Sequence, residues 1–180
     1  MIFNRLLKWS LRISFYLLLW SPCTTNGQII KTKLDIVGGI SAREYIHAGI
    51  RYQYTDFTQL GIYYGGDVGL DPEIITTYCI DNMIHFGKRS YYSNRPAWYA
   101  RQGFTYDISK ASDRTRKFSY INVGAGREFC VNNWLGFNAD LGLLVQVREK
   151  MEWKDPSLPA WYDTRVQWLP LARIQVFFSL

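Results

Sequence analysis

The sequence has little cysteine and little histidine, with three Cys and two His among 180 residues. Cys79 and Cys130, which lie beyond the N-terminal region, are too few for the disulfide framework of a small exported domain. No spacing of Cys and His matches a zinc site, and no acidic loop has the ligand pattern of a calcium site. The sequence therefore predicts no metal and no cofactor, and it predicts free thiols at both cysteines.

Long hydrophobic runs are missing as well. A transmembrane helix takes about 20 apolar residues, whereas the apolar run from Ile13 to Trp20 is much shorter. Charged residues make up only 20% of the chain and aromatic residues 17%, and a helical membrane protein would be far more hydrophobic overall. A β-barrel can have this composition because half of each strand faces the interior.

The N-terminus has the organisation of a secretory signal peptide, because basic residues precede the short apolar run and small or polar residues follow it. We expect residues 1–27 to be removed, which leaves residues 28–180 as a single domain. The alternative is lipid attachment at Cys23, for which Trp20 and Pro22 are poor neighbours.

A strong positive charge is absent once this segment is set aside. The formal net charge of the whole chain is +6, and the expected signal peptide contains three basic residues and no acidic one, which leaves +3. No basic stripe of the kind found in nucleic-acid-binding proteins remains. The sequence therefore predicts no nucleic-acid partner.

What the sequence does contain is a long alternation of apolar and polar residues. In LGFNADLGLLVQVR, residues 135–148, the odd positions are apolar and the even ones are polar or glycine, with Leu144 as the exception. A period of two is typical of a β-strand with one apolar face. The alternation is about twice as long as an ordinary strand, and transmembrane strands take roughly 9 to 11 residues. This segment therefore predicts a strand of a membrane barrel.

The alternation recurs along the chain and predicts eight strands. They cover residues 33–40, 45–54, 59–65, 77–86, 98–107, 120–128, 135–148 and 165–180. The predicted fold class is all-β, an eight-stranded antiparallel up-and-down transmembrane β-barrel. An even number of strands brings both termini to the same end, as the periplasmic side of an outer-membrane barrel requires.

The connections between these segments fit that topology in part. Two are short enough for periplasmic turns and two are long enough for extracellular loops, namely residues 55–57 and 130–133, then 107–117 and 149–163. Residues 87–96 are long for a periplasmic turn, and residues 41–44 are short for an outer loop.

Aromatic residues gather near the expected strand ends, where their amphipathic rings suit the headgroup level of a bilayer. One expected interface contains Tyr52, Tyr54, Phe57, Phe86, Trp98, Phe129, Trp134 and Phe178. The other contains Tyr64, Tyr106, Phe118, Trp153, Trp161 and Tyr162.

With this strand pattern, the YINVGAGREF segment and the ending RIQVFFSL, the chain resembles the small eight-stranded outer-membrane β-barrels of Gram-negative bacteria, of OmpA/OmpX-like architecture. The resemblance covers residues 33–180 and implies the fold and an outer-membrane location. It also implies that the barrel-assembly machinery reads a C-terminal signal at Val176, Phe178 and Leu180. Such signals usually end in an aromatic residue, whereas this chain ends in leucine.

Charged residues of both signs occupy the alternate strand positions that are expected to face the lumen. An eight-stranded barrel is just wide enough for side chains to fill its interior, and buried charges need partners. We therefore expect a closed lumen filled by an ion-pair network. Its expected members are Asp35, Arg51, Asp81, Arg101, Asp107, Glu128, Asp140, Arg148, Arg165 and Arg173.

Catalytic residues are not evident. A serine hydrolase or acyltransferase would need a histidine beside its nucleophile, and the two histidines, His47 and His85, fall near opposite ends of the expected barrel. Arg114, Arg116 and Lys117 form the densest basic cluster of the expected domain, at the outer rim, where they could contact lipid phosphates.

The sequence thus predicts a monomeric outer-membrane barrel without catalysis, in contact with outer-membrane lipid and lipopolysaccharide, with a structural or adhesive role exerted through its loops. One alternative is a soluble, lipocalin-like barrel that encloses a small apolar ligand. In that arrangement Asp140 would be exposed and Leu141 buried. A further alternative is a lipid-modifying enzyme of the outer membrane.

Overall fold

The computed structural model describes residues 34–180, apart from residues 43–44, 68–72, 94 and 156. The expected signal peptide, its cleavage site and Cys23 lie outside the described residues. The described strands are β1 (Leu34–Ser41), β2 (Tyr45–Thr55), β3 (Thr58–Gly66), β4 (Ile74–Arg89), β5 (Pro96–Lys110), β6 (Arg114–Cys130), β7 (Leu135–Trp153), β8 (Trp161–Asp163) and β9 (Gln167–Ser179).

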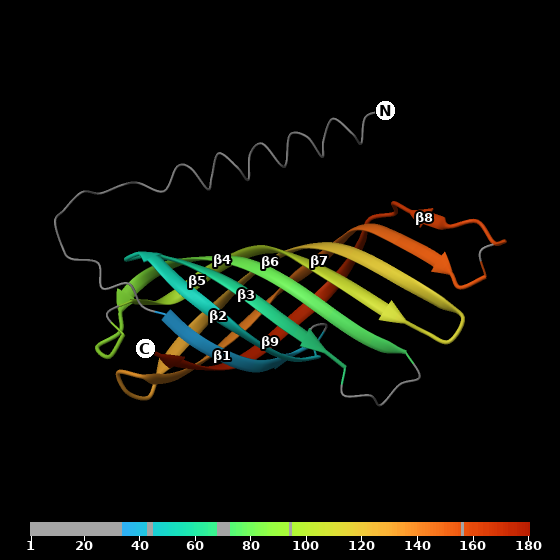
Figure 1. Ribbon diagram of the computed structural model, residues 1–180. Helices are drawn as coiled ribbons and strands as arrows, with labels where there is room; N and C mark the ends of the chain where they lie inside the picture. Colours follow the sequence, from blue (N-terminus) through green and yellow to red (C-terminus); the bar gives the residue numbers. More distant parts are fainter. Residues whose placement is uncertain (1–33, 43–44, 68–72, 94, 156) are drawn as a thin grey trace.

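The strands form a closed antiparallel barrel (Figure 1). Each of β1 to β7 pairs with its sequence neighbours, and β9 completes the ring by pairing with β1 on one side and β7 on the other. The short β8 pairs only with β7 and stands outside the ring. The predicted eight-stranded up-and-down barrel is therefore confirmed, with β8 as an addition to it.

The strands are staggered around the ring. Directly opposed residues lead from Ile36 on β1 through all the intervening strands to Trp168 on β9, yet Ile36 itself is opposite Phe178, ten residues further along β9. A stagger of this kind tilts the strands relative to the barrel axis, and with eight strands it leaves an interior that side chains can fill.

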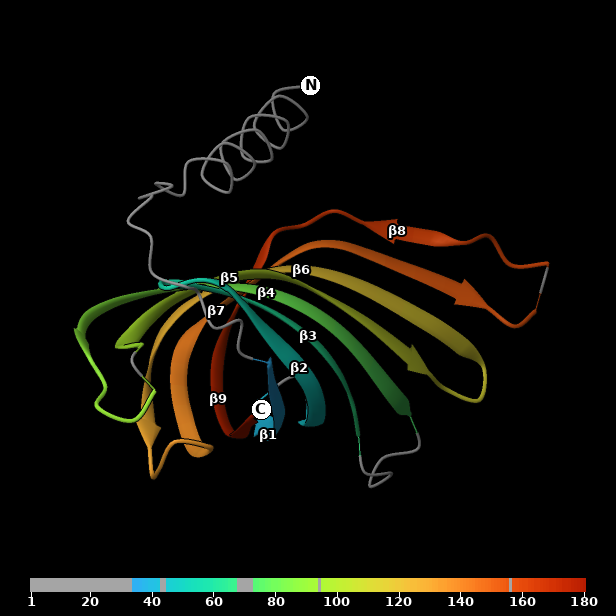
Figure 2. The ribbon, with the colours of Figure 1, turned by 60° about the vertical axis from the view of Figure 1, so that its left-hand side comes forward.

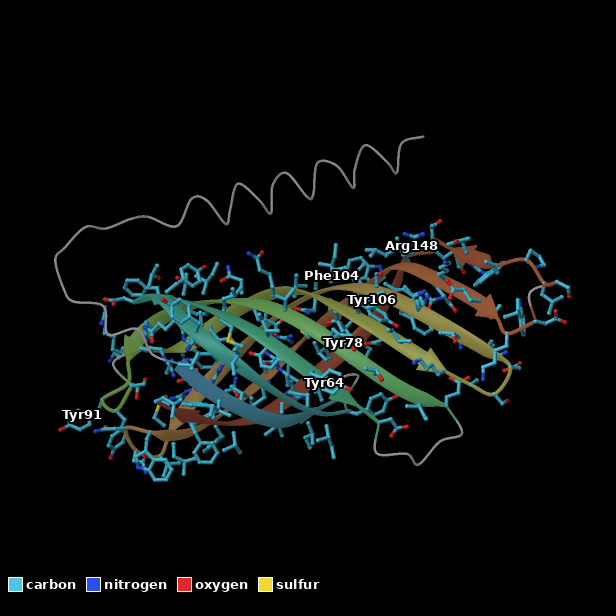
Figure 3. All side chains as sticks on the ribbon, viewed as in Figure 1. Tyr64, Tyr78, Tyr91, Phe104, Tyr106 and Arg148 are labelled. Carbon is cyan, nitrogen blue, oxygen red and sulfur yellow. The ribbon has the colours of Figure 1, made fainter. Side chains whose placement is uncertain are left out.

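Alternate residues of each strand point to opposite sides of the sheet, and those that point out of the barrel are apolar. Leu141 is 72% exposed, whereas its neighbour Asp140 is 4% exposed. Figure 3 shows the same outward direction for Tyr64 and Tyr78 on neighbouring strands, where the two rings pack edge to face. A lipocalin-like barrel would have the reverse arrangement, so this burial pattern contradicts that alternative. Among the described residues, no helix is long and apolar enough to span a bilayer.

Glycines on the inner face leave room for large lumen side chains. A Cβ at Gly126 would collide with the Tyr99 hydroxyl and with the Asp140 side chain, and one at Gly136 would collide with the Phe177 ring. The backbone of β6 and β7 can therefore lie directly against these side chains only because no Cβ is present.

The strands end at a similar level at one end of the barrel and at different levels at the other. The described N-terminal end of β1 and the C-terminus lie at one end, here called the terminal end, with the connections 56–57, 90–95 and 131–134. At the opposite end, β5, β6, β7 and β8 rise as a wall beyond β1, β2 and β3 (Figure 2). Pairing in this wall continues to Arg114 opposite Trp153, whereas β1 and β2 stop at Ser41 opposite Tyr45.

The wall corrects the predicted loops. Most of residues 107–117 belong to strands, and only residues 111–113 connect β5 to β6. Residues 149–163 likewise contain the end of β7 and all of β8. The alternation does not reveal these extensions because both of their faces carry polar and charged side chains.

Candidate functional site

The centre of the lumen holds two arginines and two aspartates, each contacting both groups of opposite charge. Arg101 lies 3.3 Å from Asp81 and 2.7 Å from Asp140, and Arg173 lies 2.7 Å from Asp81 and 3.1 Å from Asp140. The four residues come from β5, β4, β7 and β9. All are buried, and we call this group the central quartet.

A second quartet lies nearer the terminal end and is built in the same way. Arg51 lies 3.5 Å from Asp35 and 3.2 Å from Glu128, and Arg95 lies 3.0 Å from Asp35 and 3.4 Å from Glu128. Both guanidinium groups also lie over the ring of Phe177, an arrangement in which the ring face attracts the cations. We call this group the terminal quartet.

Uncharged polar side chains extend both quartets. The Tyr99 hydroxyl donates a hydrogen bond to Asp140, and Asn138 donates to the same hydroxyl and to Gln175. Gln59 donates to Asp35 and contacts His85 through its other amide atom. Each quartet therefore belongs to a larger polar network, and the rings of His85 and Tyr99, with centroids 5.5 Å apart, bring the two networks into contact.

Burial makes this network sensitive to the loss of a single charge. The four arginines and four carboxylates of the two quartets balance formally, and each has at least two oppositely charged neighbours. Removing one partner of a buried ion pair typically costs about 3–5 kcal/mol, since the other charge then stays buried without compensation.

Most of the expected network residues do lie in the lumen. The quartets contain seven of them, namely Asp35, Arg51, Asp81, Arg101, Glu128, Asp140 and Arg173. Asp107 is also buried, and it accepts a hydrogen bond from Thr77 further from the terminal end.

Two expected members lie elsewhere, and their placement corrects the prediction. The register between β6 and β7 shifts at Ser119 and Tyr120, which are opposite Arg148 and Gln146. This bulge leaves Val147 unpaired and reverses the parity beyond it, so Arg148 is exposed over the Tyr162 ring and Glu149 turns inward. Arg165 precedes β9 and is exposed, paired with Asp163.

One quartet member was missed by sequence reasoning. Arg95 lies in the connection between β4 and β5, where strand parity gives no direction, yet it is 1% exposed and reaches both carboxylates of the terminal quartet. The unusual length of residues 87–96 for a turn was the one available signal, because a longer connection can fold back into the lumen.

The predicted rim cluster is paired with carboxylates. Arg116 contacts Glu149 at 2.7 Å, Lys117 contacts Glu152 at 2.8 Å, and Arg114 lies 3.7 Å from Glu73. Lys150 also pairs with Glu152. Hydrogen bonds from Lys117 and Lys150 lower the pKa of Glu152 to about 2.

The remaining predicted positions lie as follows. Val176, Phe178 and Leu180 face outward on β9 and just beyond it, and the Phe178 ring stacks on Trp134. Phe118, expected at an aromatic interface, is instead buried in the lumen with Tyr120, because it has the inward parity of β6.

The histidines occupy separate parts of the lumen. His47 is buried, with Nε2 2.8 Å from the Gln175 amide, and its ring packs edge to face with Tyr63. His85 contacts the Pro96 carbonyl and Gln59. Within the described part of the chain, no group of three or more Cys, His, Asp or Glu side chains is placed to hold a metal ion.

Comparison with known proteins shows which solved structures have a similar fold. No protein-family model matches the sequence, and no curated protein matches it. The N-terminal β-barrel domain of Pseudomonas aeruginosa OprF is similar in structure, with a TM-score of 0.50 and 16% identity over 83% of this chain and 96% of that one. CarO of Acinetobacter baumannii has a TM-score of 0.49 and 11% identity over 80% and 96%. At the level of the fold, the predicted resemblance to small outer-membrane barrels is confirmed.

Proposed function

We propose that this chain is a monomeric outer-membrane protein whose barrel spans the bilayer, with its terminal end in the periplasm and its wall of extended strands outside the cell. The two quartets close the lumen to solutes. The role is structural or adhesive, and the extracellular wall is the part that meets other molecules.

The observation that carries this proposal is the polarity of the barrel. Large apolar side chains cover the outer face of every barrel strand, and Ile50 and Ile174 are about half exposed there, while the charged quartets are buried inside. Monomeric proteins in water rarely expose contiguous apolar surface of more than a few hundred Å². If hydrocarbon surrounds the barrel, the apolar outer face contacts lipid and the charged groups stay inside, away from it.

The lumen contents support a closed barrel. The largest fully buried side chains include the four quartet arginines together with Tyr99, Tyr120 and Phe177. Further from the terminal end, Phe118, Tyr120, Leu144 and Leu171 form a buried cluster on the lumen side of the adjacent strands β6, β7 and β9. An ion crossing the barrel would have to pass this cluster and displace two sets of paired charges.

The extended wall supports an adhesive role. Beyond the height of the shorter strands, β7 and β8 enclose a hollow of about 370 Å³ that is lined by Met151, Trp153, Leu158 and Trp161 among others. Aromatic residues near arginine, as with Tyr162 beneath Arg148, are typical of protein interaction surfaces.

Membrane fractionation with gel mobility tests the location. We expect the protein in the outer-membrane fraction, and we expect unboiled samples to migrate differently from boiled ones because the folded barrel resists detergent. Recovery of the whole protein in the soluble periplasm would refute the proposal. Steady conductance of the purified barrel in planar bilayers would refute the closed lumen.

No catalytic step belongs to the proposal. His47 contacts the Gln175 amide, and its ring packs edge to face with Tyr63. We expect His47→Ala to leave the lipid A of the cell unchanged. Recognition by the barrel-assembly machinery through Val176, Phe178 and Leu180, and lipopolysaccharide contact by Arg114, Arg116 and Lys117, remain predictions.

A further inference from the structure

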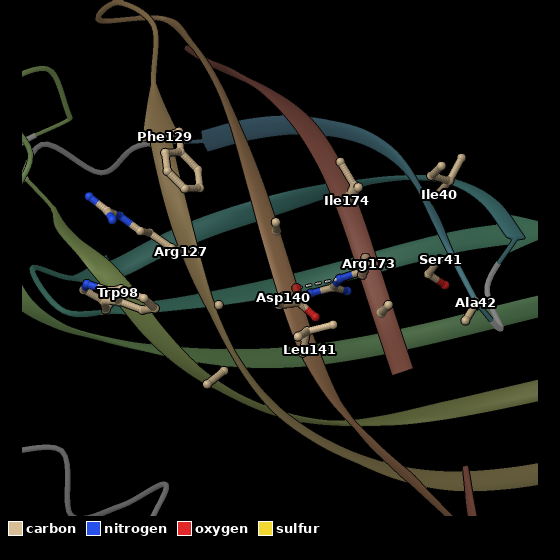
Figure 4. Close-up of a pocket in the computed structure, with 14 residues that line it drawn as sticks. Ile40, Ser41, Ala42, Trp98, Arg127, Phe129, Asp140, Leu141, Arg173 and Ile174 are labelled. Carbon is tan, nitrogen blue, oxygen red and sulfur yellow. Dashed lines mark hydrogen bonds and ion pairs between the residues drawn. The ribbon is translucent and has the colours of Figure 1, made fainter. Parts of the chain in front are cut away.

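The outer wall of the barrel is hollowed over β6, β7 and β9 (Figure 4). The hollow has a volume of about 690 Å³, within the range of about 300–1,000 Å³ typical of small-molecule sites. The small side chains of Ala125, Ala139 and Ala172 contribute to its lining, and larger side chains such as Ile174 and Phe129 line it as well. Asp140 and Arg173 also line it, although their side chains pair inside the lumen.

An arginine stands at one edge of this hollow on the outer face. Arg127 is exposed, and its guanidinium lies 5.3 Å from the centre of the Trp98 ring and 5.0 Å from that of the Phe129 ring. Across the part of the chain that the structure describes, no carboxylate lies within ion-pair distance of Arg127. Its positive charge is therefore held in place by two aromatic rings and is available to an anion.

The height of Arg127 suits the headgroup level of a bilayer. It lies three residues before Cys130, the last residue of β6, so it is about 10 Å along the strand from the terminal end at a rise of about 3.3 Å per residue. A long arginine side chain at this depth can reach the membrane surface. Trp98 and Phe129 belong to the aromatic positions expected at the same interface.

The hollow extends from this arginine toward the middle of the membrane. Arg127, Ala139, Ile174 and Ile40 are directly opposed on consecutive strands and form one row around the outer wall. Because the strands are tilted, a row perpendicular to them climbs along the barrel axis. Its arginine end therefore lies at the headgroups, and its aliphatic end lies in the hydrocarbon.

We propose that this hollow is a binding site for one anionic glycerophospholipid of the periplasmic leaflet, of the phosphatidylglycerol class. Its phosphodiester is held by Arg127 and one acyl chain lies along the hollow. The inference rests on the proposed membrane location and adds a specific lipid to it.

Charge and shape favour this occupant. A guanidinium can bind two phosphate oxygens at once, and such charge-assisted hydrogen bonds are among the strong ones. The zwitterionic phosphatidylethanolamine carries an ammonium group that competes with Arg127 for the same phosphate. The lining beyond Arg127 is aliphatic, and the alanines leave space that a flexible acyl chain fills and that a second rigid barrel would fill poorly.

Native mass spectrometry of the folded, detergent-purified barrel, titrated with phosphatidylglycerol or phosphatidylethanolamine, tests the proposal. We expect one tightly bound phosphatidylglycerol per barrel. In Arg127→Gln the affinity should fall at least about tenfold, since a charge-assisted hydrogen bond is lost. Ala139→Leu, which fills the hollow and keeps the arginine, should also weaken binding.

Two variants are matched controls. Lys88→Gln removes a cation near the same end of β4, and Ala48→Leu adds the same side-chain volume to the outer face of β2, away from the hollow. Both should bind phosphatidylglycerol as the wild type does. Unchanged gel mobility before boiling shows that each variant is folded.

Equal retention of phosphatidylglycerol by wild type and Arg127→Gln would overturn the site, as would equal affinity for the two lipids in the wild type. Either result would leave the proposed membrane location intact if the protein still fractionates with the outer membrane. A soluble protein would refute the proposed function itself.

Discussion

Arg173 on β9 donates a hydrogen bond of 2.7 Å to Asp81 on β4, and so connects the last strand of the barrel to its fourth across the lumen. The two residues are 92 positions apart in the sequence. Since Asp140 and Arg101 complete the same quartet, the centre of the barrel depends on groups from four separate strands.

Removing Asp81 should strongly destabilise the barrel. In Asp81→Asn, Arg101 and Arg173 share a single carboxylate, and we expect the free energy of unfolding to fall by about 3–5 kcal/mol. Urea titration of the protein folded in detergent or lipid measures this change. The matched control is Asp163→Asn, whose partner Arg165 is exposed. There we expect little change in stability, because an exposed ion pair is screened by water. Equal effects of the two substitutions would contradict the role of burial.

Removing Arg95 should loosen the connection between β4 and β5. Arg95→Ala leaves Asp35 and Glu128 with only Arg51, so we expect a loss of stability of about 3–5 kcal/mol and faster proteolysis of residues 90–95. Arg89→Ala is the control, because Arg89 and Asp56 form a half-exposed pair at the same end. Proteolysis as slow as in the wild type would show that Arg95 does not hold this turn.

Adding a Cβ at Gly126 should lower the stability of the barrel. In Gly126→Ala the added atom meets Tyr99 and Asp140, and overpacking of this kind costs about 1–3 kcal/mol. Thermal unfolding in detergent measures the effect. In the control Gly38→Ala the nearest atom to the new Cβ is the His47 carbonyl oxygen at 3.9 Å, so stability should hardly change. A Gly126→Ala protein as stable as Gly38→Ala would mean that the lumen can rearrange around the added methyl group.

Glu152 should make the extended wall sensitive to acid. Hydrogen bonds from Lys117 and Lys150 hold its pKa at about 2, below the ordinary value of 4.5. A lowered pKa in the folded state stabilises the protein at pH values above 4.5, and this contribution is lost as the pH falls from about 4.5 to about 2. Glu152→Gln should therefore be less stable than the wild type at pH 7 and equally stable near pH 2. A stability difference that does not change with pH would refute this assignment.

The sequence predicted the barrel well because membrane strands repeat one simple pattern. The contrast between Asp140 and Leu141 follows directly from strand parity, and the structure buries the first and exposes the second. The same reasoning predicted that seven charged residues face the lumen, and these seven are members of the quartets. It depends only on the period of two, which holds as long as the pairing is regular.

Strand parity did not predict the direction of side chains where strand pairing is irregular or absent. Arg148 faces outward because of the bulge at Val147, and Arg95 reaches the lumen from a connection that has no parity at all. The strand ends beyond Asp107 were also missed, since residues that meet water on both sides show no alternation. Neither a bulge nor a folded-back turn leaves a local mark in composition that would identify it.

The terminal quartet has a consequence for the biogenesis of the barrel. Asp35 and Arg51 belong to the first hairpin, while Arg95 and Glu128 come from the middle of the chain. A nascent chain that has delivered only its first hairpin to the bilayer would carry the Asp35–Arg51 ion pair without its other two partners, on a face that no further strand yet shields from lipid. Insertion strand by strand is therefore disfavoured, and the protein should enter the membrane as a nearly complete, curved sheet.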